Sequence, residues 1–533
     1  MSVMERDLQL PGRSTVYGTD FAAATSQPAA TFTAMRVMSE GGNAVDAAIA
    51  ACAVLAVTEP MSTGPGGDCF ALIHRTGRPT IGYNGSGRAP AALDLARVQA
   101  AAPGAHTIDP DSALSVTVPG AVEAWARLLA DHGTWDLDQV LAPAIALAEA
   151  GFAVAPRCAA DWARDAARLA ADPGCADHFL PHGRAPQAGD RMRLPALGAT
   201  LRAVAQQGAA GFYEGAVAQD LCDSVRARGG VLAEADLAGH AGTYVTPLAF
   251  AHHGHTLLEL PPNGHGIVAQ IMLGVQQGFD LAGLAPLSPE RLHLQIEAAR
   301  LAWGPRDALI ADPDHADVPV EAMLAPAYLA RLRAAFDPGR AMATDRAPVL
   351  PGGDTVYLTT VDRDGTTVSL INSIFHHFGA ALCGRSSGVL LQNRGCGFSL
   401  QPGHPNVVAP GKRPLHTIIP GMVLKDGDVV LGFGVMGGPY QPVGHAHVLT
   451  NLLDFDLSPQ AALDLARVFP MGCVDQVERG VPAASVAALA ARGHVPVPAD
   501  EPLGGGQMIR IDRARGTLAA ASDPRKDGLA LAR

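Results

Sequence analysis

The stretch 352-GGDTVYLTTVDRDGTTVSLINSIF-375 decides how the rest of the chain is interpreted. Apolar and polar residues alternate on both sides of Asp364-Gly365, and a period of two around an Asp-Gly pair predicts a β-hairpin. The preceding segment, residues 334–354, is rich in Gly and Pro and has no periodicity, which predicts a loop. Thr355 therefore opens a strand directly after a long loop.

A Thr in this position has a chemical use beyond starting a strand. If the bond between Asp354 and Thr355 were cut, Thr355 would carry both a hydroxyl nucleophile and a free α-amine. The ordinary pKa of an α-amine is about 8, so the amine can act as the base for the hydroxyl of its own residue. From these residues alone, the alternative that Thr355 is an ordinary β-branched residue at the start of a strand stays open.

Outside the hairpin, the chain is helical before it and strand-rich after it. The Ala-rich stretch 27–58 predicts two helices separated by Gly41-Gly42. The spacing of apolar residues predicts further helices at 121–131, 138–150, 157–171, 196–240, 265–280, 288–303 and 441–467. Strands are predicted within 69–87, 243–260, 388–393, 417–435 and 507–523. The sequence thus predicts an α/β fold with a helix-rich first two-thirds, a sheet-rich last third, and strands between helical layers.

The composition excludes several classes of protein. Of 533 residues, 48% are hydrophobic and 17% are charged, so a large core is available and global disorder is excluded. The formal net charge is −12 and no basic run occurs, so nucleic acid is not an expected partner. The 8 Cys are scattered without a Cys-x-x-Cys pair, which argues against a zinc ribbon or a disulfide scaffold and favours a reducing compartment.

The N-terminal residues and the longest apolar stretch bear on cellular location. Residues 1–20 contain no apolar core of signal-peptide length. The stretch from Ala44 to Thr58 is too short to span a bilayer and contains Asp46. The sequence therefore predicts a cytoplasmic protein that does not enter a membrane.

Six motifs, in order along the chain, carry a resemblance to a known family. The two longest are GGNAVDAAIAACAVLAVTEPMSTGPGGDCFALIH at 41–74 and DTVYLTTVDRDGTTVSLINSIFHHFGA at 354–380. The others are VTVPGAVEAW at 116–125, PGKRPLHTIIP at 410–420, VMGGPYQPVGH at 435–445 and SDPRKDG at 522–528. Together they resemble the γ-glutamyltranspeptidases over roughly residues 20–530.

The resemblance implies an N-terminal-nucleophile (Ntn) hydrolase with a four-layer αββα sandwich. Self-cleavage between Asp354 and Thr355 would give a large subunit, residues 1–354, and a small subunit, residues 355–533, which remain intertwined as one catalytic domain. The expected substrate is a small-molecule amide, and no cofactor and no metal are expected. A dimer of such heterodimers is left open.

The resemblance also implies catalytic roles for four residues. Thr355 matches the nucleophile, and Ser373 falls where the family has a second Thr whose hydroxyl hydrogen-bonds the nucleophile. Gly437 and Gly438 match a Gly-Gly pair whose backbone N–H groups hold the oxyanion of the tetrahedral intermediate. A residue without Cβ suits that task because the backbone can come close to the substrate. The alternatives are a solvated hairpin Ser and a plain turn.

Departures from the family pattern concern the acyl group of the substrate. In typical members, an amide side chain and an acid follow the segment LLQN and hold the glutamyl α-amine; Arg394 and Gly397 stand there instead. An ammonium is not expected beside Arg394, because like charges repel, whereas a guanidinium suits a carboxylate. The expected acyl group is therefore anionic and lacks the α-amine, as in oxamate-like, glutaryl or succinyl amides. This pattern resembles the oxamate-amidohydrolase and acylase-like branch; an Arg394 that braces the Gly-rich loop is the alternative.

Further residues are expected to bind the substrate. Asn393 adjoins Arg394, and His416 and Thr417 stand where the family has two Ser residues. Ser86 aligns with the Arg that clamps the α-carboxylate of the substrate, and Arg88, two positions on, is the candidate substitute.

Two other functions stay open at this point. One is a true γ-glutamyltransferase or glutathione hydrolase, and the other is an uncleaved, inactive binding protein. The run His252-His253-Gly254-His255 is interpreted as part of an ordinary strand, since a metal site needs further ligands. His376 and His377 are candidates for lining the pocket, and Cys396 has no assigned role.

Overall fold

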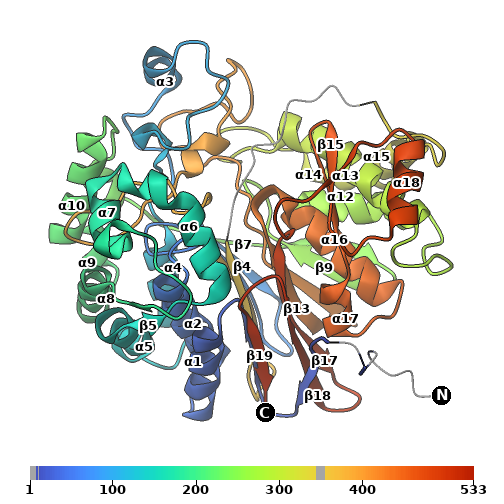
Figure 1. Cartoon of the computed structure of the whole chain (residues 1–533), viewed down its shortest axis with the longest axis horizontal. Coiled ribbons are helices and arrows are strands. Elements are labelled where there is room, and N and C mark those ends of the chain that lie inside the picture. The colour runs from blue at the N-terminus through green and yellow to red at the C-terminus, as the bar shows by residue number, and fades with distance from the viewer. Residues whose placement is uncertain (1–5, 7, 10, 344–354) are drawn as a thin grey trace.

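The computed structural model of the chain describes residues 6, 8–9, 11–343 and 355–533. It is a mixed α/β structure with two seven-stranded antiparallel sheets at its centre. Figure 1 shows helices from the first half of the chain beside one sheet and helices α12 to α18 beside the other. Asp354, on the N-terminal side of the expected cleavage point, lies outside the described residues, as does most of the predicted loop before it.

The sheet that contains the hairpin is called the first sheet. Its strand order is β19 (Leu529–Ala532), β2 (Ala22–Thr25), β10 (Val356–Val361), β11 (Thr367–Ser373), β3 (Asp68–His74), β4 (Ile81–Gly85) and β7 (Thr243–Val245). The hairpin predicted around Asp364-Gly365 is confirmed as β10 and β11, with Val356 opposite Asn372. β10 lies between β2 and β11, so strands from both sides of position 354 alternate in this sheet.

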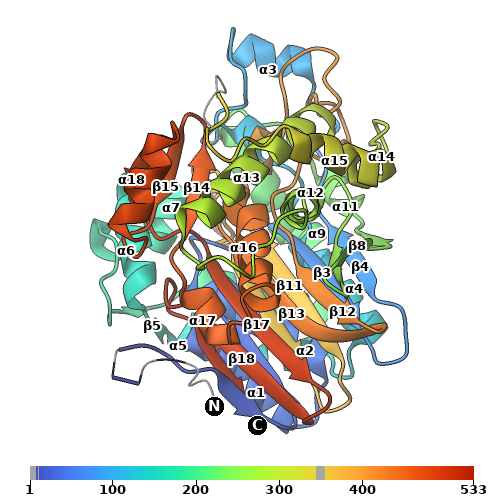
Figure 2. The ribbon, with the colours of Figure 1, turned by 90° about the vertical axis from the view of Figure 1, so that its right-hand side faces the viewer.

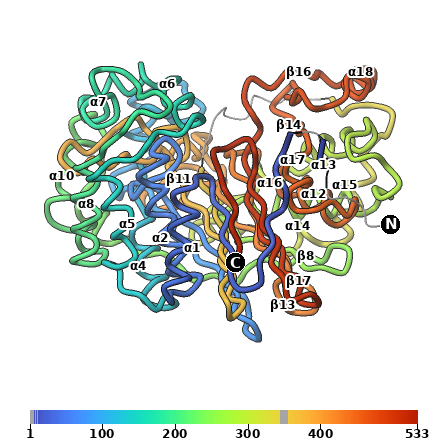
Figure 3. Tube along the Cα trace, turned by 60° about the horizontal axis from the view of Figure 1, so that its bottom comes forward, coloured from blue at the N-terminus to red at the C-terminus, as the bar shows by residue number. Residues whose placement is uncertain are grey.

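The second sheet lies against the first. Its strand order is β1 (Val16–Gly18), β18 (Thr517–Ser522), β17 (Gly505–Asp512), β13 (Asp428–Met436), β12 (Gly421–Lys425), β9 (His255–Glu259) and β8 (Leu248–His252). Small residues on β13 let the sheets approach, because a Cβ added to Gly434 would lie 2.4 Å from the ring of Tyr357 on β10. Figure 3 shows the C-terminal strand β19 near the middle of the molecule, and it pairs with β2 from the N-terminal part.

The remaining elements surround these sheets. The helices on the side of the first sheet are α1 (Pro28–Ser39), α2 (Ala44–Thr58), α3 (Leu95–Ala101), α4 (Ala121–His132), α5 (Leu137–Ala150), α6 (Pro156–Ala170), α7 (Pro173–Phe179), α8 (Pro195–Gln207), α9 (Ala210–Tyr213), α10 (Gly215–Ala227) and α11 (Glu234–Ala238). Those on the side of the second sheet are α12 (Ile267–Gln276), α13 (Pro289–Leu309), α14 (Val320–Leu324), α15 (Pro326–Ala334), α16 (Gln441–Leu453), α17 (Pro459–Asp464) and α18 (Ala483–Ala491). Small sheets are formed by β14 (Val468–Met471), β15 (Val474–Val477) and β16 (Pro496–Pro498), and by β5 (Phe152–Ala153) and β6 (Arg191–Met192). Short 3-10 helices are η1 (Ala113–Ser115), η2 (Pro181–Gly183), η3 (Arg394–Gly397) and η4 (Gly438–Tyr440).

Helix α2 shows why the Ala-rich stretch has this composition. All of its residues are buried, because it lies between the hairpin strands and the helices α1 and α5. Small side chains let a helix approach its neighbours on every side, so the segment needs no polar face. Asn43 and Asp46 form a capping box at its start, and Asp46 also accepts hydrogen bonds from the backbone and hydroxyl of Thr134. The predicted break at Gly41-Gly42 between two helices is confirmed.

One predicted strand is wrong. Residues 388–393, GVLLQN, form no strand, because their amides bond to three separate partners instead of one neighbouring strand. The N–H groups of Leu391, Gln392 and Asn393 donate to the carbonyls of Leu382, Gly66 and Ile374, respectively. The segment therefore crosses beneath the hairpin as an irregular chain, which carries Arg394 toward the end of β11.

None of the helices that the structure describes combines the length and the apolar character that crossing a membrane requires.

Candidate active site

The hydroxyl groups of Thr355 and Ser373 meet at the open end of the hairpin. Thr355 immediately precedes β10, and Ser373 is the last residue of β11. Their Oγ atoms are 3.2 Å apart, and both residues are buried. The antiparallel register that pairs Val356 with Asn372 is the reason, since it places the preceding and following residues across from each other. The hydroxyl contact expected between these residues is thus present.

The oxygen of Ser373 receives two further donors. The backbone N–H of Phe375 donates to it over 2.9 Å, and Nη2 of Arg394 donates over 3.3 Å. Hydrogen bonds from a charged donor are stronger than those from a neutral one. Ser373 is therefore held by the backbone on one side and by a guanidinium on the other, with the hydroxyl of Thr355 as its third partner.

Arg394 is fully buried, and none of the carboxylates that the structure describes forms an ion pair with it. Its Nη1 donates to Oγ1 of Thr417 over 2.7 Å, and its guanidinium carbon lies 4.0 Å from the ring centroid of Phe375. Within the described ranges no carboxylate lies at ion-pair distance from Arg394, and its Nε has no hydrogen-bond partner. Burial lowers the pKa of the guanidinium to about 10, so the side chain still carries its charge at neutral pH.

Asp68 brings a buried negative charge to this network, and it interacts electrostatically with Arg394. It starts β3 directly opposite Ser373, and its Oδ1 accepts hydrogen bonds from Gln392 and from the backbone N–H of Gly87. Its Oδ2 accepts from Nε2 of His416 over 2.9 Å. Burial alone would raise the pKa of the Asp68 carboxyl, but the hydrogen bond from His416 and the charge of Arg394 bring it below its ordinary value. Asp68 is therefore an ionised, fully enclosed carboxylate.

Both ring nitrogens of His416 form hydrogen bonds within the protein. Its Nδ1 accepts a hydrogen bond from the N–H of Ile418, and its Nε2 donates to Asp68. Burial and the charge of Arg394 lower the pKa of His416 to about 4, so the ring is neutral at pH 7. No ring nitrogen of His416 is left for a substrate, whereas Thr417, the next residue, contacts Arg394 directly.

The turn 64-GPGG-67 packs under the hairpin. A Cβ on Gly66 would lie within 2.0 Å of the carbonyl oxygen of Leu390, and a Cβ on Gly67 would lie 2.3 Å from the carbonyl oxygen of Ser373. Only glycine permits such close backbone contact. Gly66 also accepts a hydrogen bond from the N–H of Gln392. The turn therefore constrains the backbone positions of Ser373 and of the segment before Arg394.

Gly437 and Gly438 follow β13 and lead into η4. Both have positive φ, 125° and 54°, and a Cβ on Gly437 would lie 3.0 Å from the Cα of Gly504. These two positions therefore require glycine, as expected for the Gly-Gly pair. Three residues beyond Gly438, Nε2 of Gln441 lies 3.5 Å from Oγ1 of Thr355, and its Oε1 accepts from the N–H of Ile419.

The sequence analysis missed Asp68 and Gln441. Both lie inside quoted motifs, at the end of GPGGD and within VMGGPYQPVGH. The available signal was a polar side chain close to a Gly-Gly pair: Asp68 directly follows Gly66-Gly67, and Gln441 stands three residues after Gly438. Their partners could not be identified, because 348 residues separate Asp68 from His416 and 86 separate Gln441 from Thr355.

Asn393 and His376 form a layer next to Arg394. Nδ2 of Asn393 bonds to Nδ1 of His376 and to the carbonyl of Pro110, so the amide ties three segments together. The ring of His376 stacks on Phe375 with centroids 4.3 Å apart. Burial and the charge of Arg394 lower the pKa of His376 to about 4. Burial raises the pKa of the Cys396 thiol to about 12, so this side chain does not supply a thiolate near pH 7.

Arg88 is engaged elsewhere. Its Nη1 lies 3.3 Å from Asp312 and donates to the carbonyl of Gly411, and its Nη2 lies 2.8 Å from Asp314. These contacts join Arg88 to the loop after α13, and none of them involves Thr355 or Arg394. A clamp on a substrate carboxylate would require Arg88 to leave both aspartates.

A cavity of about 620 Å³ borders the site. Gly437 and His376 line it on the side of the Thr355–Ser373 pair, and His377 lines it as well. Helix α6 contributes Arg157, Arg164, Asp165 and Arg168, and the opposite wall includes Tyr440, Phe469 and Met471. His376 and His377, the two histidines expected to line the pocket, therefore both lie at this cavity.

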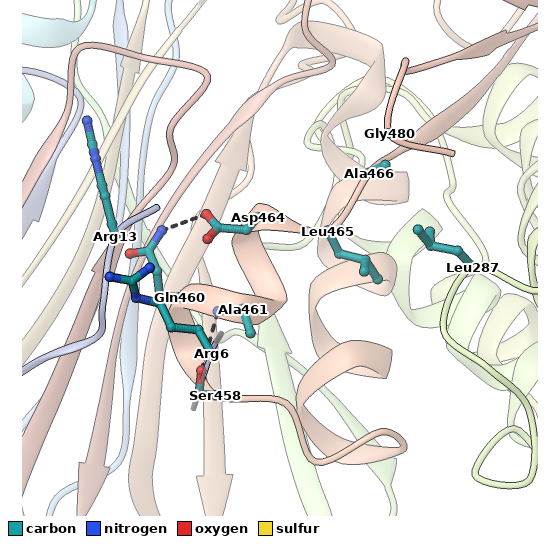
Figure 4. Close-up of a pocket in the computed structure, with 10 residues that line it drawn as sticks. All are labelled: Arg6, Arg13, Leu287, Ser458, Gln460, Ala461, Asp464, Leu465, Ala466 and Gly480. Carbon is teal, nitrogen blue, oxygen red and sulfur yellow. Dashed lines mark hydrogen bonds between the residues drawn. The ribbon is translucent and has the colours of Figure 1, made fainter. Parts of the chain in front are cut away.

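A second cavity lies away from this chemistry. Figure 4 shows it beside α17, with Gln460 hydrogen-bonded to Asp464 and with Arg13 and Leu287 on its borders. None of the residues around Thr355, Ser373 or Arg394 lines it. Thr355, Ser373 and Arg394 line neither cavity, but Gly437 and His376 line the cavity of about 620 Å³, which is therefore the candidate substrate cleft.

Comparisons with known proteins can be set beside this geometry. The family model described as Gamma-glutamyltranspeptidase matches residues 30–532. The chain is 34% identical over 509 residues to the glutathione hydrolase-like YwrD proenzyme of Bacillus subtilis (strain 168), covering 93% of this chain and 95% of the relative. It is 34% identical over 515 residues to the oxamate amidohydrolase proenzyme of Klebsiella pneumoniae, covering 93% and 95%. The crystal structure of a cephalosporin acylase from Bacillus halodurans matches with a TM-score of 0.93 and 38% identity, covering 100% of this chain and 99% of the other.

Proposed function

The chain belongs to the γ-glutamyltranspeptidase family as an Ntn amidohydrolase proenzyme, and we propose that it hydrolyses amides whose acyl group carries a carboxylate but no α-amine. The single observation that carries this proposal is the environment of Arg394. A fully buried guanidinium, charged at neutral pH and without an ion-pair partner among the described residues, lies within hydrogen-bond distance of the nucleophile's own partner, Ser373.

A buried charge without a partner of opposite sign is energetically unfavourable. Leaving a buried charge without a partner costs roughly 3–5 kcal/mol, which corresponds to about 150-fold to a few thousandfold in an equilibrium. A carboxylate on the acyl group would pair with Arg394 as the amide reaches Thr355. An α-ammonium there would meet a like charge instead, and Asp68 is already occupied by His416 and Gln392.

In the proposed mechanism, cleavage before Thr355 frees its α-amine. The amine takes the proton of Oγ1, the oxygen attacks the amide carbon, and the N–H groups of Gly437 and Gly438 hold the oxyanion. The C–N bond then breaks, the proton passes to the leaving amine, and an ester to Thr355 remains. Water, deprotonated by the same α-amine, hydrolyses this ester and releases the carboxylic acid. Ser373 keeps Oγ1 of Thr355 in position throughout.

The layered arrangement fits this proposal. We interpret the two facing sheets with helices on their outer sides as the four-layer αββα sandwich of the Ntn hydrolases, with residues 1–354 and 355–533 as its two intertwined subunits. The cavity of about 620 Å³ is large for an oxamate-like amide and favours substrates with a bulky amine as leaving group. A cytoplasmic location belongs to the same proposal and rests on the scattered cysteines.

Three p-nitroanilides with one leaving group test the proposal. Glutaryl-p-nitroanilide has the carboxylate without the α-amine, γ-glutamyl-p-nitroanilide adds the amine, and pentanoyl-p-nitroanilide lacks both. We expect kcat/KM to be highest for the glutaryl compound, by about tenfold or more over each of the others. The Arg394→Gln variant should lose most of the glutaryl-to-pentanoyl preference, and that ratio separates substrate binding from a general loss of activity through Ser373.

The opposite order of substrate preference would support the alternative function, that of a glutathione hydrolase. If the unmodified enzyme hydrolyses γ-glutamyl-p-nitroanilide efficiently and the glutaryl compound poorly, it is a glutathione hydrolase-type enzyme and the role given to Arg394 is wrong. Restoring the family's acid with Gly397→Asp is not a clean reciprocal test. A Cβ at that position would lie 2.9 Å from the carbonyl oxygen of Leu415, so the backbone would shift as well.

A further inference from the structure

A second cluster of chemically active side chains lies at the edge of the second sheet. His252 ends β8, His253 follows in the turn to β9, and Asp454 follows the last residue of α16. Nε2 of His253 lies 3.0 Å from Oδ1 of Asp454, and Nε2 of His252 lies 3.7 Å from Oδ2. One ligand atom from each of the three residues falls within 4.8 Å of the others, which is the size of a metal coordination shell.

The buried members of this cluster lack hydrogen-bond partners. His252 is 2% exposed, and neither of its ring nitrogens has a hydrogen-bond partner. Oδ2 of Asp454 is buried and has none either. Buried polar atoms are almost always paired, because an unpaired one keeps the full cost of its lost hydration. A single cation between the imidazole and the carboxylate would satisfy atoms on both residues at once.

We propose that His252, His253 and Asp454 bind a divalent transition-metal ion, with Zn²⁺ as the ion that fits best. Two imidazole nitrogens and one carboxylate oxygen are a common zinc donor set, whereas Mg²⁺ and Ca²⁺ take oxygen ligands. His253 is 44% exposed at its side chain, so the fourth position faces water and the ion has a path of entry. The sequence analysis predicted no metal here because Asp454 lies on a distant segment.

A buried cation lies near this site without occupying it. The charge of Arg291 interacts with Asp454, but its guanidinium nitrogens bond to His447 and Asn451. The positive charge lowers the affinity expected for a metal and leaves the three ligand atoms available. We therefore expect a dissociation constant in the micromolar range and not the far tighter binding of a closed four-ligand site.

The position of the cluster indicates what the ion would do. β8 is the edge strand of the second sheet, and α16 runs from the cluster back to Gln441, which contacts Thr355 (Figure 2). An ion bound to Asp454 and the two histidines would crosslink the β8–β9 hairpin to the C-terminal end of α16. The 13 residues of α16 span about 20 Å, so the metal would stabilise the fold without taking part in the chemistry at Thr355.

The other histidine cluster is a weaker candidate. His293, Glu297 and His494 also lie within 4.8 Å of one another, but His293 and His494 already bond to each other over 2.6 Å. Arg300 donates to both Glu297 and His494 from within the cluster. A metal ion there would have to displace a guanidinium and break an existing chain of hydrogen bonds.

The test uses the untagged full-length protein, stripped with a chelator and titrated with Zn²⁺ alone. Calorimetry should show saturable binding of about one ion per chain, and thermal unfolding should move to a higher temperature with added Zn²⁺. The His253→Ala variant should weaken binding by at least about tenfold and lose the thermal shift. The His253→Ala variant should fold, because it removes an exposed side chain. The Asp454→Asn variant keeps the shape of the buried side chain and should also weaken Zn²⁺ binding. His106→Ala, an exposed histidine elsewhere, is the matched control and should bind like the unmodified protein.

Two results would overturn the proposal. One is the absence of saturable Zn²⁺ binding by the unmodified protein at concentrations up to the millimolar range. The other is binding that survives both His253→Ala and Asp454→Asn but disappears in Glu297→Gln, which would place the ion in the other cluster.

Discussion

At the scale of single residues, the site depends on how one hydroxyl oxygen is held. Ser373 Oγ accepts hydrogen bonds from Phe375 and Arg394 and contacts Oγ1 of Thr355, the proposed nucleophile, so removing it should misplace Thr355 and leave substrate binding largely unchanged. We expect Ser373→Ala to lower kcat by about ten- to a hundredfold with a much smaller change in KM. Ser369→Ala is the matched control, since this buried hydroxyl on the same strand contacts Tyr357 instead. Steady-state kinetics on processed protein decide the matter, and an unchanged kcat would assign Ser373 to the scaffold.

Gln441 offers a second test at the same scale. Gln441→Glu keeps an oxygen for the N–H of Ile419 but removes the only donor that the side chain directs at Thr355, over 3.5 Å. A carboxylate there would also add negative charge beside Oγ1 of Thr355, the oxygen that gives up its proton as it attacks the amide. We therefore expect turnover to be at least about tenfold lower than that of the unmodified enzyme at pH 8, and this deficit to shrink at acidic pH as the new carboxyl gains a proton. A pH profile parallel to that of the unmodified enzyme would contradict this role.

At the scale of elements, the turn 64-GPGG-67 sets the position of the hairpin. Gly67→Ala would place a Cβ 2.3 Å from the carbonyl oxygen of Ser373, so one of the two backbones has to move. We expect a loss of about 1–3 kcal/mol in the free energy of unfolding, together with lower turnover. Gly64→Ala is the control, because its Cβ would have no atom closer than 4.0 Å. Denaturant unfolding of both variants tests this, and equal stabilities would show that the close contact is not a constraint.

The secondary-structure elements differ in how well the sequence predicts them. Local periodicity was enough for the helices within 27–58 and for the hairpin, because each is defined by contacts between near neighbours. It failed at 388–393, where apolar residues at strand spacing bond to three different segments. It was silent on Asp68, whose importance arises only from the alignment of β3 with β11. Thr417 was expected from the resemblance, but its hydrogen bond to Arg394 could be found only in three dimensions.

The motif 522-SDPRKDG-528 contributes Asp523 and Arg525 to a cluster of ion pairs with Arg467. Oδ2 of Asp523 lies 2.6 Å from Nη2 of Arg467, and both side chains are fully buried. Burial would raise the pKa of Asp523, but the charges of Arg467 and Arg525 lower it below its ordinary value. A carboxyl whose pKa is lower in the folded state stabilises the fold above its unfolded pKa, near about 4, and loses that contribution as the pH falls through the folded pKa.

Asp523→Asn should therefore destabilise the protein in a pH-dependent way. At pH 7 we expect a loss of about 3–5 kcal/mol, because Arg467 stays buried without its partner. The difference from the unmodified protein should narrow below about pH 4. Asp512→Asn, which removes a surface pair with Arg515, should cost at most about 1 kcal/mol at either pH. Unfolding midpoints measured across this pH range provide the check, and a difference that is constant with pH would exclude the ionised form of Asp523 as its source.

At the scale of the whole molecule, the order of strands decides what cleavage can do. In the first sheet β10 and β11 lie between β2 and β3, and in the second sheet β12 and β13 lie between β17 and β9. Strands from both sides of position 354 therefore share both of the large sheets. A cut before Thr355 would leave the two pieces joined by sheet hydrogen bonds and buried surface, so the molecule should keep its size under native conditions.

This arrangement leads to the prediction on which the proposed mechanism depends. Intact-mass analysis of the mature protein should find residues 1–354 and 355–533 as separate chains, while size-exclusion chromatography finds them in one particle. Thr355→Ala should remain a single chain of 533 residues without amidase activity, because it lacks the hydroxyl needed both for cleavage and for attack on the substrate. Thr355→Ser keeps a hydroxyl and should be cleaved more slowly. Thr359→Ala, at a buried Thr on the same strand, should be cleaved like the unmodified protein. Full-length protein that is active without any cleavage would falsify the mechanism, since Thr355 would then have no free α-amine to serve as its base.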